Sequence, residues 1–235
     1  MCGRFSIADP KAIQSAMKDL AIRIPEEPRY NIAPAQMVPV VLNDGKRELS
    51  MARWGLIPSW AKDISIGQKL FNARAETITE NPSFRESFMK RRCLIFADGF
   101  YEWATVPGNP KRTPFRVTRN DESLFAFAGL WDVWHDPEGD SILSTTIITT
   151  TPNELMKSFH HRMPVILPND RFNDWIVPGS VQPEELMSFL TQYPARLMKA
   201  YPVSANVNSA ANDDLSCLEP LPATESNDLF GQSVR

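Results

Sequence analysis

The sequence is poor in the residues that build disulfide frameworks and metal sites. Of its 235 residues only three are cysteine and three are histidine, and no Cys-x-x-Cys or His-x-x-x-His pair occurs. This spacing argues against a disulfide scaffold and against a zinc site, so no metal or other cofactor is expected. An odd number of widely spaced cysteines is typical of a reducing compartment.

Long apolar runs and a strong charge of one sign are also missing. No stretch is apolar over the ~20 residues that a membrane-spanning helix needs, and Arg4 and Asp9 interrupt any signal-peptide core. The formal net charge of −3 excludes nucleic-acid binding by bulk charge and leaves only a local basic groove. We therefore expect a cytoplasmic protein without a membrane partner.

Glycine is scarce beside proline, with 10 glycines and 20 prolines, which indicates fixed turns and short elements. The 43% hydrophobic and 23% charged residues are ordinary values for a globular domain. No repeat or linker divides the chain. We therefore expect one domain over residues 2–217, followed by a disordered tail over residues 218–235.

Short apolar segments separated by turn signals predict an α+β fold. Val38–Leu42 and Glu48–Trp54 flank Asn43-Asp44-Gly45, which is a strong hairpin signal. An antiparallel, barrel-like β core is expected from further short strands. These strands are Cys93–Ala97, Phe100–Thr105, Phe115–Arg119, Leu124–Leu130 and Ile142–Thr150.

Short helices are expected to flank this core. Asp9-Pro10 predicts the start of a capped helix of about three turns that reaches Leu20. Thr151-Pro152 predicts the start of another helix, which delivers His160 at its end. The segment from Val203 to Asn208 is expected to be extended.

The first residues carry the most distinctive chemistry. Cys2 follows Met1, and aminopeptidases normally remove a methionine that precedes so small a residue. The mature chain would then begin with an exposed amine that titrates near ~8 and a thiol that titrates near ~8.5, both partly nucleophilic at neutral pH. Such an aminothiol condenses with an aldehyde to an imine, which the thiol closes to a thiazolidine. Nearby Arg4 could hold an anion. Taken alone, Cys2 is more often a small apolar filler.

Two positions could supply acid–base chemistry. Glu102 lies among aromatic residues in a predicted strand, and a carboxyl in such surroundings has a raised pKa; an outward-facing glutamate is the alternative. His160 and His161 are adjacent, and adjacent helical positions do not face each other. Only one of them is therefore expected to point into a site, and a contact with a helix C-terminus is the alternative.

Other polar and aromatic residues are suited to contact a nucleic acid. An extended segment would place Asn72, Arg74 and Glu76 on one face, where Asn72 could orient a substrate and Arg74 could bind a phosphate. A salt-bridged surface strand is the alternative. Trp54 and Trp60 are more often core residues, although the proline-containing loop between them could leave Trp60 projecting.

Together these motifs resemble the SRAP family, the SOS response-associated peptidase domain, whose members are abasic-site processing proteins. The resemblance runs in order over roughly residues 2–208. Its blocks are Met1–Phe5, Arg29–Pro34, Trp54–Trp60, Asn72–Thr77, Arg92–Trp103, His160–Pro164, Pro202–Ser204 and Val207-Asn208. The chain departs from the family pattern at His161, where members usually have aspartate, so the catalytic role is assigned to His160 and that of His161 is left open.

The resemblance implies binding to single-stranded DNA, or to single-strand/duplex junctions, that contains an abasic site. The ring-opened sugar presents an aldehyde, so the implied product is a covalent thiazolidine crosslink that shields the lesion during the DNA damage response and repair. The implied catalytic residues are Cys2, Asn72, Glu102 and His160. The implied DNA-binding residues are Arg4, Arg74, Trp60 and Arg162.

Two alternatives stay open at this point. The family name describes a cysteine-type autopeptidase, a hydrolase that would expose Cys2 by its own cleavage. The other alternative is a non-covalent binder of single-stranded DNA in which Cys2 is inert. A lyase-like crosslinking protein is the interpretation we carry forward, as a monomer that associates with the bacterial nucleoid when it engages DNA.

Overall fold

Two β-sheets form the framework of the computed structural model, which describes residues 2–18, 27–106, 111–136 and 138–222. The strands are β1 (Phe5–Ile7), β2 (Arg29–Ile32), β3 (Met37–Leu42), β4 (Leu49–Trp54), β5 (Asn72–Arg74), β6 (Arg92–Ala97), β7 (Gly99–Ala104), β8 (Thr113–Arg119), β9 (Phe125–His135), β10 (Ser141–Thr150), β11 (Met163–Pro164), β12 (Ile166–Leu167) and β13 (Met198–Pro202). The α-helices are α1 (Ala12–Ala16), α2 (Arg85–Lys90), α3 (Phe172–Trp175) and α4 (Pro183–Met187).

Five strands of the larger sheet close into a ring. β10 pairs with β4, β4 with β3, β3 with β6 and β6 with β9, and β9 returns to β10. All these pairings are antiparallel except that of β4 with β10. The ring closes where Arg53 and Trp54 of β4 lie opposite Ser144 and Thr145 of β10. The α+β fold with a barrel-like core is thus confirmed, and β5 is added to it by parallel pairing with β10.

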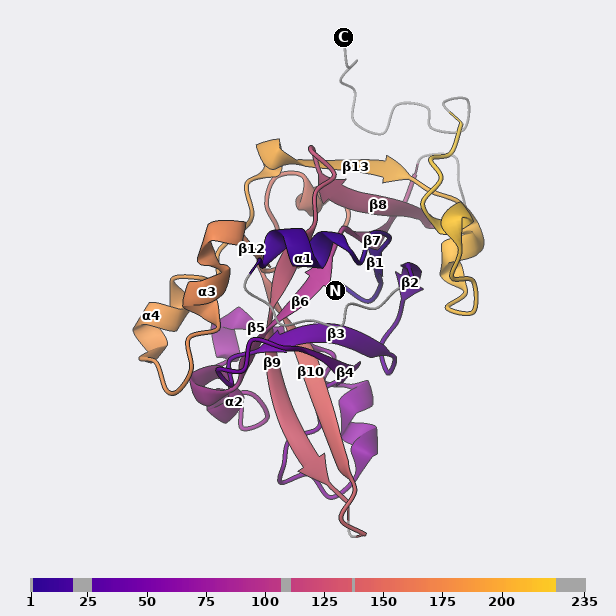
Figure 1. The fold of residues 1–235 in the computed structure, drawn as a ribbon. Coiled ribbons are helices and arrows are strands. Elements are labelled where there is room, and N and C mark those ends of the chain that lie inside the picture. The colour runs from indigo at the N-terminus through magenta and orange to yellow at the C-terminus, as the bar shows by residue number, and fades with distance from the viewer. Residues whose placement is uncertain (1, 19–26, 107–110, 137, 223–235) are drawn as a thin grey trace.

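The smaller sheet carries the N-terminal strand. Its order is β13-β8-β7-β1-β2, and it lies above the barrel strands β3, β4, β9 and β10 in Figure 1. In the register of β1, Phe5 is opposite Phe100 of β7 and Ile32 of β2. The first residues of the chain are therefore held in the middle of the fold by strands on both sides.

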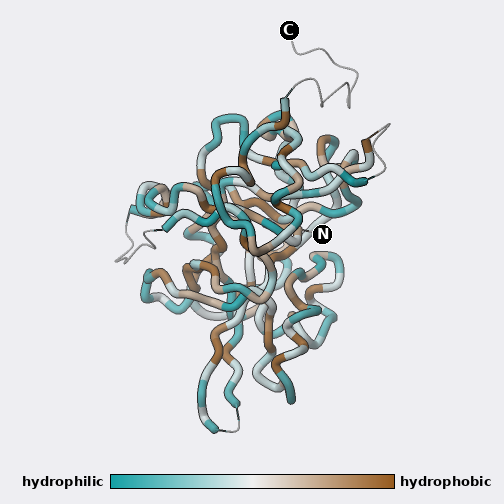
Figure 2. Tube along the Cα trace, turned by 90° about the vertical axis from the view of Figure 1, so that its right-hand side faces the viewer, coloured by the Kyte–Doolittle hydropathy of each residue, from teal (hydrophilic) through white to brown (hydrophobic). Residues whose placement is uncertain are grey.

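Aromatic packing joins the two sheets at Phe5. This side chain is fully buried, and its ring makes edge-to-face contacts with Trp54 at 5.0 Å and Phe127 at 5.7 Å between centroids. Trp54 belongs to β4 and Phe127 to β9, both barrel strands. Figure 2 shows the hydrophobic segments concentrated along the strands in the middle of the molecule, while many outer loops are hydrophilic.

The predicted hairpin is confirmed, with Met37 of β3 opposite Arg53 of β4. Gly45 in its turn has φ +83°, a conformation that glycine adopts without a steric penalty. The later strands also lie where the sequence places them. β9 differs because it continues to His135 and pairs with β10 along the projecting hairpin.

The predicted helices are shorter than expected. Helix α1 ends at Ala16, and Met17 has φ −134° and ψ 85°; Leu20 lies outside the described residues. After Thr151-Pro152 the structure forms only a 3₁₀ turn, Met156–Ser158. The N–H of Met156 donates a hydrogen bond to Asn153 Oδ1. A side-chain hydrogen bond to the backbone stabilises this single turn. The longer elements are the strands that are buried in the barrel.

The segment expected to be extended after Val203 is instead a 3₁₀ turn, Ala205–Asn208. The Ser204 side chain accepts a hydrogen bond from the N–H of Asn206, which favours a turn over a strand. The beginning of the expected tail packs against the fold, because Pro220 forms a β-bridge with Val203. Residues 223–235 lie outside the described residues.

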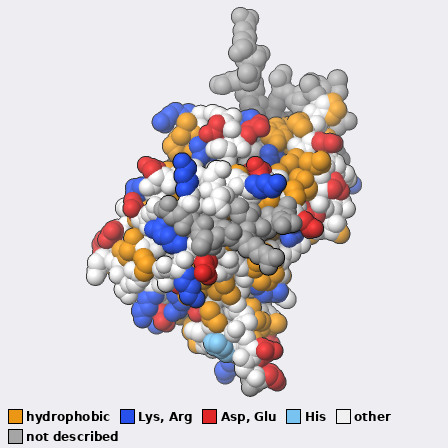
Figure 3. Space-filling view, in the orientation of Figure 1, with side chains coloured by type: hydrophobic (Ala, Val, Ile, Leu, Met, Phe, Trp, Pro, Cys, Tyr) orange, Lys and Arg blue, Asp and Glu red, His pale blue; other side chains and the backbone are white. Residues whose placement is uncertain are grey.

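The surface carries mixed charge. On the face seen in Figure 3, lysine and arginine side chains are interspersed with acidic and apolar ones. This face therefore has no continuous patch of one sign, as the small net charge leads one to expect. None of the helices in the described part of the chain is both long enough and apolar enough to cross a bilayer.

Candidate functional site

Cys2 is buried rather than exposed. It has no accessible surface and belongs to the main hydrophobic cluster, whereas the sequence led us to expect an exposed terminal residue. Burial raises the pKa of the Cys2 thiol well above its usual range, and the nearby Glu102 carboxylate raises it further. The thiol is consequently protonated at neutral pH.

Asn72 touches Cys2 directly. Its side-chain Nδ2 donates a hydrogen bond to the backbone oxygen of Cys2 at 2.8 Å. The parallel pairing of β5 with β10 holds this residue, with Asn72 opposite Ile147. Asn72 Oδ1 is buried and has no hydrogen-bond partner among the described residues. A buried acceptor left unpaired costs about 1–3 kcal/mol, so this atom is suited to receive a donor from a substrate or from the N-terminus.

Glu102 faces inward from β7. It is 4% exposed, so the alternative of an outward-facing glutamate is wrong. Burial raises the pKa of its carboxyl, and the positive charge of Arg112 opposes that rise. A carboxyl with a raised pKa is suited to exchange protons near neutral pH, and the electrostatic effect of Glu102 on the Cys2 thiol shows that the two groups are close.

His160 and His161 form a stacked pair, with ring centroids 4.2 Å apart and an interplanar angle of 27°. His160 Nδ1 accepts a hydrogen bond from the Arg162 N–H at 3.0 Å, which leaves Nε2 to carry the proton of the neutral ring. Burial lowers the pKa of His160 to about 4, and the charges of His161 and Arg112 add to the effect. His160 is therefore neutral at pH 7.

The four residues predicted to be DNA-binding fall into two groups. Arg74 and Trp60 are exposed, Trp60 at 57%. Arg162 is buried, forms a bidentate ion pair with Glu76 at 2.7 and 2.8 Å, and donates to Thr149 O. Arg4 is likewise held by protein acceptors. The segment from Asn72 is extended only as far as Arg74, where a 3₁₀ turn places Glu76 against Arg162.

A segment near the C-terminus, residues 205–217, covers the N-terminal strand. Arg4 Nη1 donates to Asn31 Oδ1 at 2.8 Å and to Val207 O at 2.5 Å. The amide of Asn31 donates in turn to the carbonyls of Val207, Ser209 and Asn212. Asp213 accepts from the backbone N–H groups of residues 30 and 31. This arrangement, which we call the C-terminal strap, fixes the backbone that follows Cys2.

Sequence reasoning missed Asn31, Asp213 and Arg112 as parts of the site's surroundings. Arg112 is exposed, donates a hydrogen bond to Trp103 O, and acts electrostatically on both Glu102 and His160. Its position directly before β8, which pairs with the Glu102 strand, was the available signal. A lone arginine beside a turn carries no distinctive pattern by itself.

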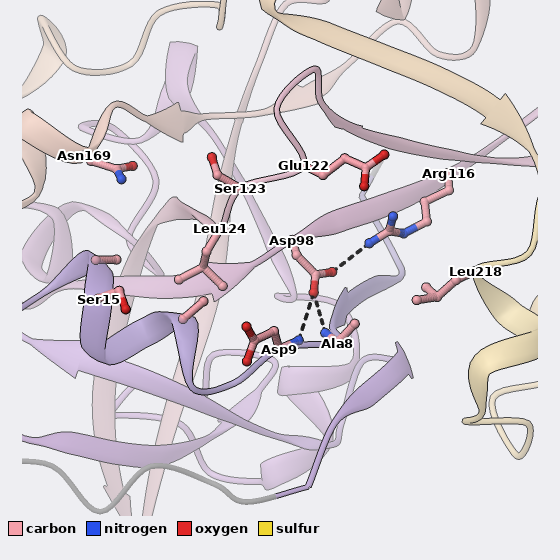
Figure 4. A pocket seen from close by; sticks show the side chains of 12 residues that line it. Ala8, Asp9, Ser15, Asp98, Arg116, Glu122, Ser123, Leu124, Asn169 and Leu218 are labelled. Carbon is pink, nitrogen blue, oxygen red and sulfur yellow. Dashed lines mark hydrogen bonds and ion pairs between the residues drawn. The ribbon is translucent and has the colours of Figure 1, made fainter.

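A separate cavity of about 520 Å³ lies between α1 and β8. Figure 4 shows Asp98 there, bound to Arg116 at 2.8 Å and to the backbone N–H groups of Ala8 and Asp9. None of the sequence-predicted site residues lines it. Asp98 links the end of β1 to the β6–β7 corner, so we interpret this pair as structural support for the N-terminal strand.

The local geometry thus combines a buried thiol, an acceptor amide and a buried carboxyl around the start of the chain, with a neutral histidine linked to them through the field of Arg112. Within the described part of the chain, no three of the histidine, cysteine, aspartate or glutamate side chains gather as a metal site would require. This set of groups suits proton transfer and nucleophilic attack.

The family model described as SOS response associated peptidase (SRAP) matches residues 1–210. The chain belongs to this family. Among the curated SRAP relatives, the abasic site processing protein YoqW of Bacillus subtilis is 45% identical over 224 residues, which are 93% of this chain and 99% of the relative. The abasic site processing protein HMCES of Gallus gallus is 34% identical over 225 residues, which are 83% of this chain and 66% of the relative.

Solved structures resemble this SRAP chain as well. A crystal structure of a protein from Bacteroides thetaiotaomicron superimposes with a TM-score of 0.81 at 28% identity and covers 94% of this chain and 100% of that one. A protein from Bordetella bronchiseptica superimposes with a TM-score of 0.75 at 28% identity and covers 86% of this chain and 100% of that one. The barrel with its appended sheet is thus shared by other proteins.

Proposed function

We propose that this SRAP chain processes abasic sites by binding single-stranded DNA and linking Cys2 covalently to the ring-opened sugar. The observation that carries the proposal is the contact of Asn72 with Cys2 beside the buried Glu102 carboxyl. The curated relatives are named abasic site processing proteins, which supports an abasic site as the substrate. The role requires removal of Met1, because only then is the Cys2 nitrogen a free amine.

The amine of Cys2 attacks first in this proposal. Burial keeps the thiol protonated, and a thiol is a far weaker nucleophile than a thiolate. The amine adds to the sugar aldehyde and the adduct loses one water to give an imine. The Cys2 sulfur then bonds to the same carbon while its proton passes to the imine nitrogen, which closes the thiazolidine ring. The protein and the DNA strand lose one water in total.

The neighbouring groups have separate roles. Glu102 accepts a proton from the Cys2 amine and returns it during loss of water, a task suited to a carboxyl with a raised pKa. Neutral His160 directs its Nε2–H at the sugar ring oxygen to assist ring opening. Asn72 holds the backbone of Cys2, and its unpaired Oδ1 accepts a hydrogen bond from the amine or from a sugar hydroxyl.

The DNA strand is held by exposed groups beside the site. We assign a backbone phosphate to Arg74 and base stacking to Trp60, because both side chains are accessible. The contacts of Arg4 and Arg162 favour a positioning role for these two residues, since acceptors of the protein already hold both guanidinium groups. Proximity then raises the effective concentration of the aldehyde at Cys2.

The decisive experiment is the intact mass of the purified protein before and after exposure to single-stranded DNA with one abasic site. We expect loss of Met1 and then a gain equal to the DNA strand minus one water. Cys2→Ser should give no heat-stable product, because serine cannot close a thiazolidine. Glu102→Gln should slow the reaction by about 100-fold or more while the affinity for DNA is retained.

The same measurement separates the alternatives. A non-covalent binder would show no mass gain although it retards the DNA, and a peptidase would cleave an added polypeptide. Equal, heat-stable products from the wild type and from Cys2→Ser would contradict the ring chemistry. If Cys2→Ser gives only an imine that must be trapped with borohydride, the result agrees with the proposed ring closure by the thiol.

A further inference from the structure

His160 also lines a cleft. The cleft has a volume of about 590 Å³, and the residues that line it are Arg112, Pro152, Lys157, Phe159, His160 and His161. They come from three places in the chain: the approach to β8, the segment that follows β10, and the turn Met156–Ser158 with the residues after it. The stacked rings of His160 and His161 belong to the lining.

Among the described residues that line this cleft, two are cations and none is a carboxylate. Arg112 and Lys157 are both exposed. The partner of Lys157 is Glu154, whose Oε1 lies 2.5 Å from Nζ, but the two side chains are 57% and 81% exposed. An ion pair so open to water contributes little to stability. Lys157 can therefore exchange Glu154 for an incoming anion at small cost.

Arg112 connects the cleft to the reaction site. Arg112 lines the cleft together with His160, and its charge contributes to lowering the pKa of both His160 and Glu102. A hydrogen bond to Trp103 O anchors it. An anion bound between Arg112 and Lys157 would lie immediately beside His160, which also lines the cleft.

We propose that the cleft formed by Arg112, Lys157 and His161 binds a backbone phosphate of the DNA strand next to the lesion. This inference rests on the proposed function, which supplies the strand. A phosphate offers charged oxygens for the guanidinium and the ammonium group, and the His161 ring is a further donor. The cleft adds a phosphate contact to the one that we assign to Arg74.

The test is the salt dependence of binding to a lesion-free single-stranded oligonucleotide, followed by fluorescence anisotropy. The double variant Arg112→Gln/Lys157→Gln should bind more weakly than the wild type. Its slope of log affinity against log salt should be shallower by about 0.7, the value for one lost phosphate contact on a single strand. The single variant Lys157→Gln should weaken binding in the same direction, and it decides the matter if the double variant fails to fold.

The matched control is Lys46→Gln/Lys90→Gln. Both lysines are exposed and pair with acidic neighbours, Lys46 with Asp44 at 3.7 Å and Lys90 with Glu86 at 3.8 Å. This control removes the same charge from outside the cleft and should keep the wild-type slope. An unchanged slope in the cleft variants, or an equal change in the control, would overturn the inference.

Crosslinking to abasic DNA is measured in parallel at saturating DNA. If the crosslink forms and the slope of the cleft variants is unchanged, the cleft assignment fails and the proposed function stands. If the slope falls but no crosslink forms in the wild type, the covalent proposal fails while the phosphate contact remains.

Discussion

At the scale of single residues, burial decides the chemistry of the site. Cys2 and Glu102 have pKa values raised chiefly by burial, whereas the pKa of His160 is lowered by it. The common cause is that low dielectric surroundings disfavour the charged form of each group. Near neutral pH the site therefore holds a protonated thiol and a neutral imidazole, beside a carboxyl whose pKa is raised above its ordinary value.

The titration of His160 gives a direct check of this account. We expect its imidazole resonances to titrate with a midpoint near pH 4, compared with ~6.5 in an unfolded chain. Between these values the unfolded state binds more protons than the folded state. The free energy of unfolding should thus fall as the pH drops through this range, and it should be fully regained above about pH 6.5.

The control for this titration is His160→Gln, which keeps a polar side chain and removes the ionisable group. Its loss of stability between pH 7 and pH 5, measured by urea unfolding, should be smaller than that of the wild type. An NMR midpoint near 6.5 for His160, or an identical loss in the variant, would show that His160 is not shielded as the structure indicates.

At the scale of elements, the C-terminal strap fixes the N-terminal strand. Asn31 is fully buried in β2, and its amide bonds to Arg4 and to three carbonyls of the strap. Because both ends of this side-chain amide are hydrogen-bonded, it joins the N-terminal strands to the strap, which is far away in the sequence. The Cys2 thiol donates to Arg4 O at 3.9 Å, and Arg4 in turn donates to Val207 O of the strap. The strap therefore contributes to the placement of Cys2 through Arg4.

Replacement of Asn31 tests the strap. Asn31→Ala should lower the free energy of unfolding by about 2 kcal/mol or more, because it leaves Arg4, the buried carbonyl of Val207 and two partly buried carbonyls with fewer partners. Crosslinking should be slower than in the wild type at saturating DNA. Asn120→Ala is the control, since Asn120 is exposed and donates to a single carbonyl, that of Arg196; its effect should stay within about 0.5 kcal/mol.

Chemical denaturation measures both variants, and intact mass against time measures the crosslinking rate. Equal stability of Asn31→Ala and Asn120→Ala would contradict a structural role for the strap. A destabilised Asn31→Ala that crosslinks at the wild-type rate would show that the strap supports the fold without positioning Cys2.

At the scale of the whole molecule, the N-terminal strand and Cys2 are part of the core. Phe5 joins the appended sheet to the barrel through Trp54 and Phe127, and Cys2 belongs to the same hydrophobic cluster. A terminus is usually among the least ordered parts of a domain. Here Cys2 is held by the packing that holds the two sheets together, which gives this residue a defined position.

Phe5→Ala should consequently destabilise the protein by about 3–5 kcal/mol, the usual range for removal of a buried aromatic ring. Phe5→Leu should cost less because it fills part of the space. Met51→Ala is the control, since Met51 is 45% exposed on β4, and it should change stability by less than about 0.5 kcal/mol. A cost below 1 kcal/mol for Phe5→Ala in urea unfolding would disprove a central role for this ring.

The strands of the barrel were predictable because short apolar segments are separated by turn residues, and both signals are local in the sequence. The hairpin around Gly45 is the clearest case, since the turn and the register both follow from neighbouring residues. The helices were predicted less well. Helix α1 and the turn Met156–Ser158 end early, because tertiary contacts outweigh the weak propensity of a few residues.

The sequence by itself determined which chemical groups are available: an aminothiol once Met1 is removed, a glutamate among aromatic residues, and two adjacent histidines. Covalent neighbours and motif order are written in the chain, so these features needed no coordinates. Only the tertiary structure decided that Asn72 bonds to Cys2, that Glu102 is buried, and that Arg112 acts on both Glu102 and His160. Burial and the field of a distant charge depend on strands that meet across the whole chain, and no local pattern contains that information.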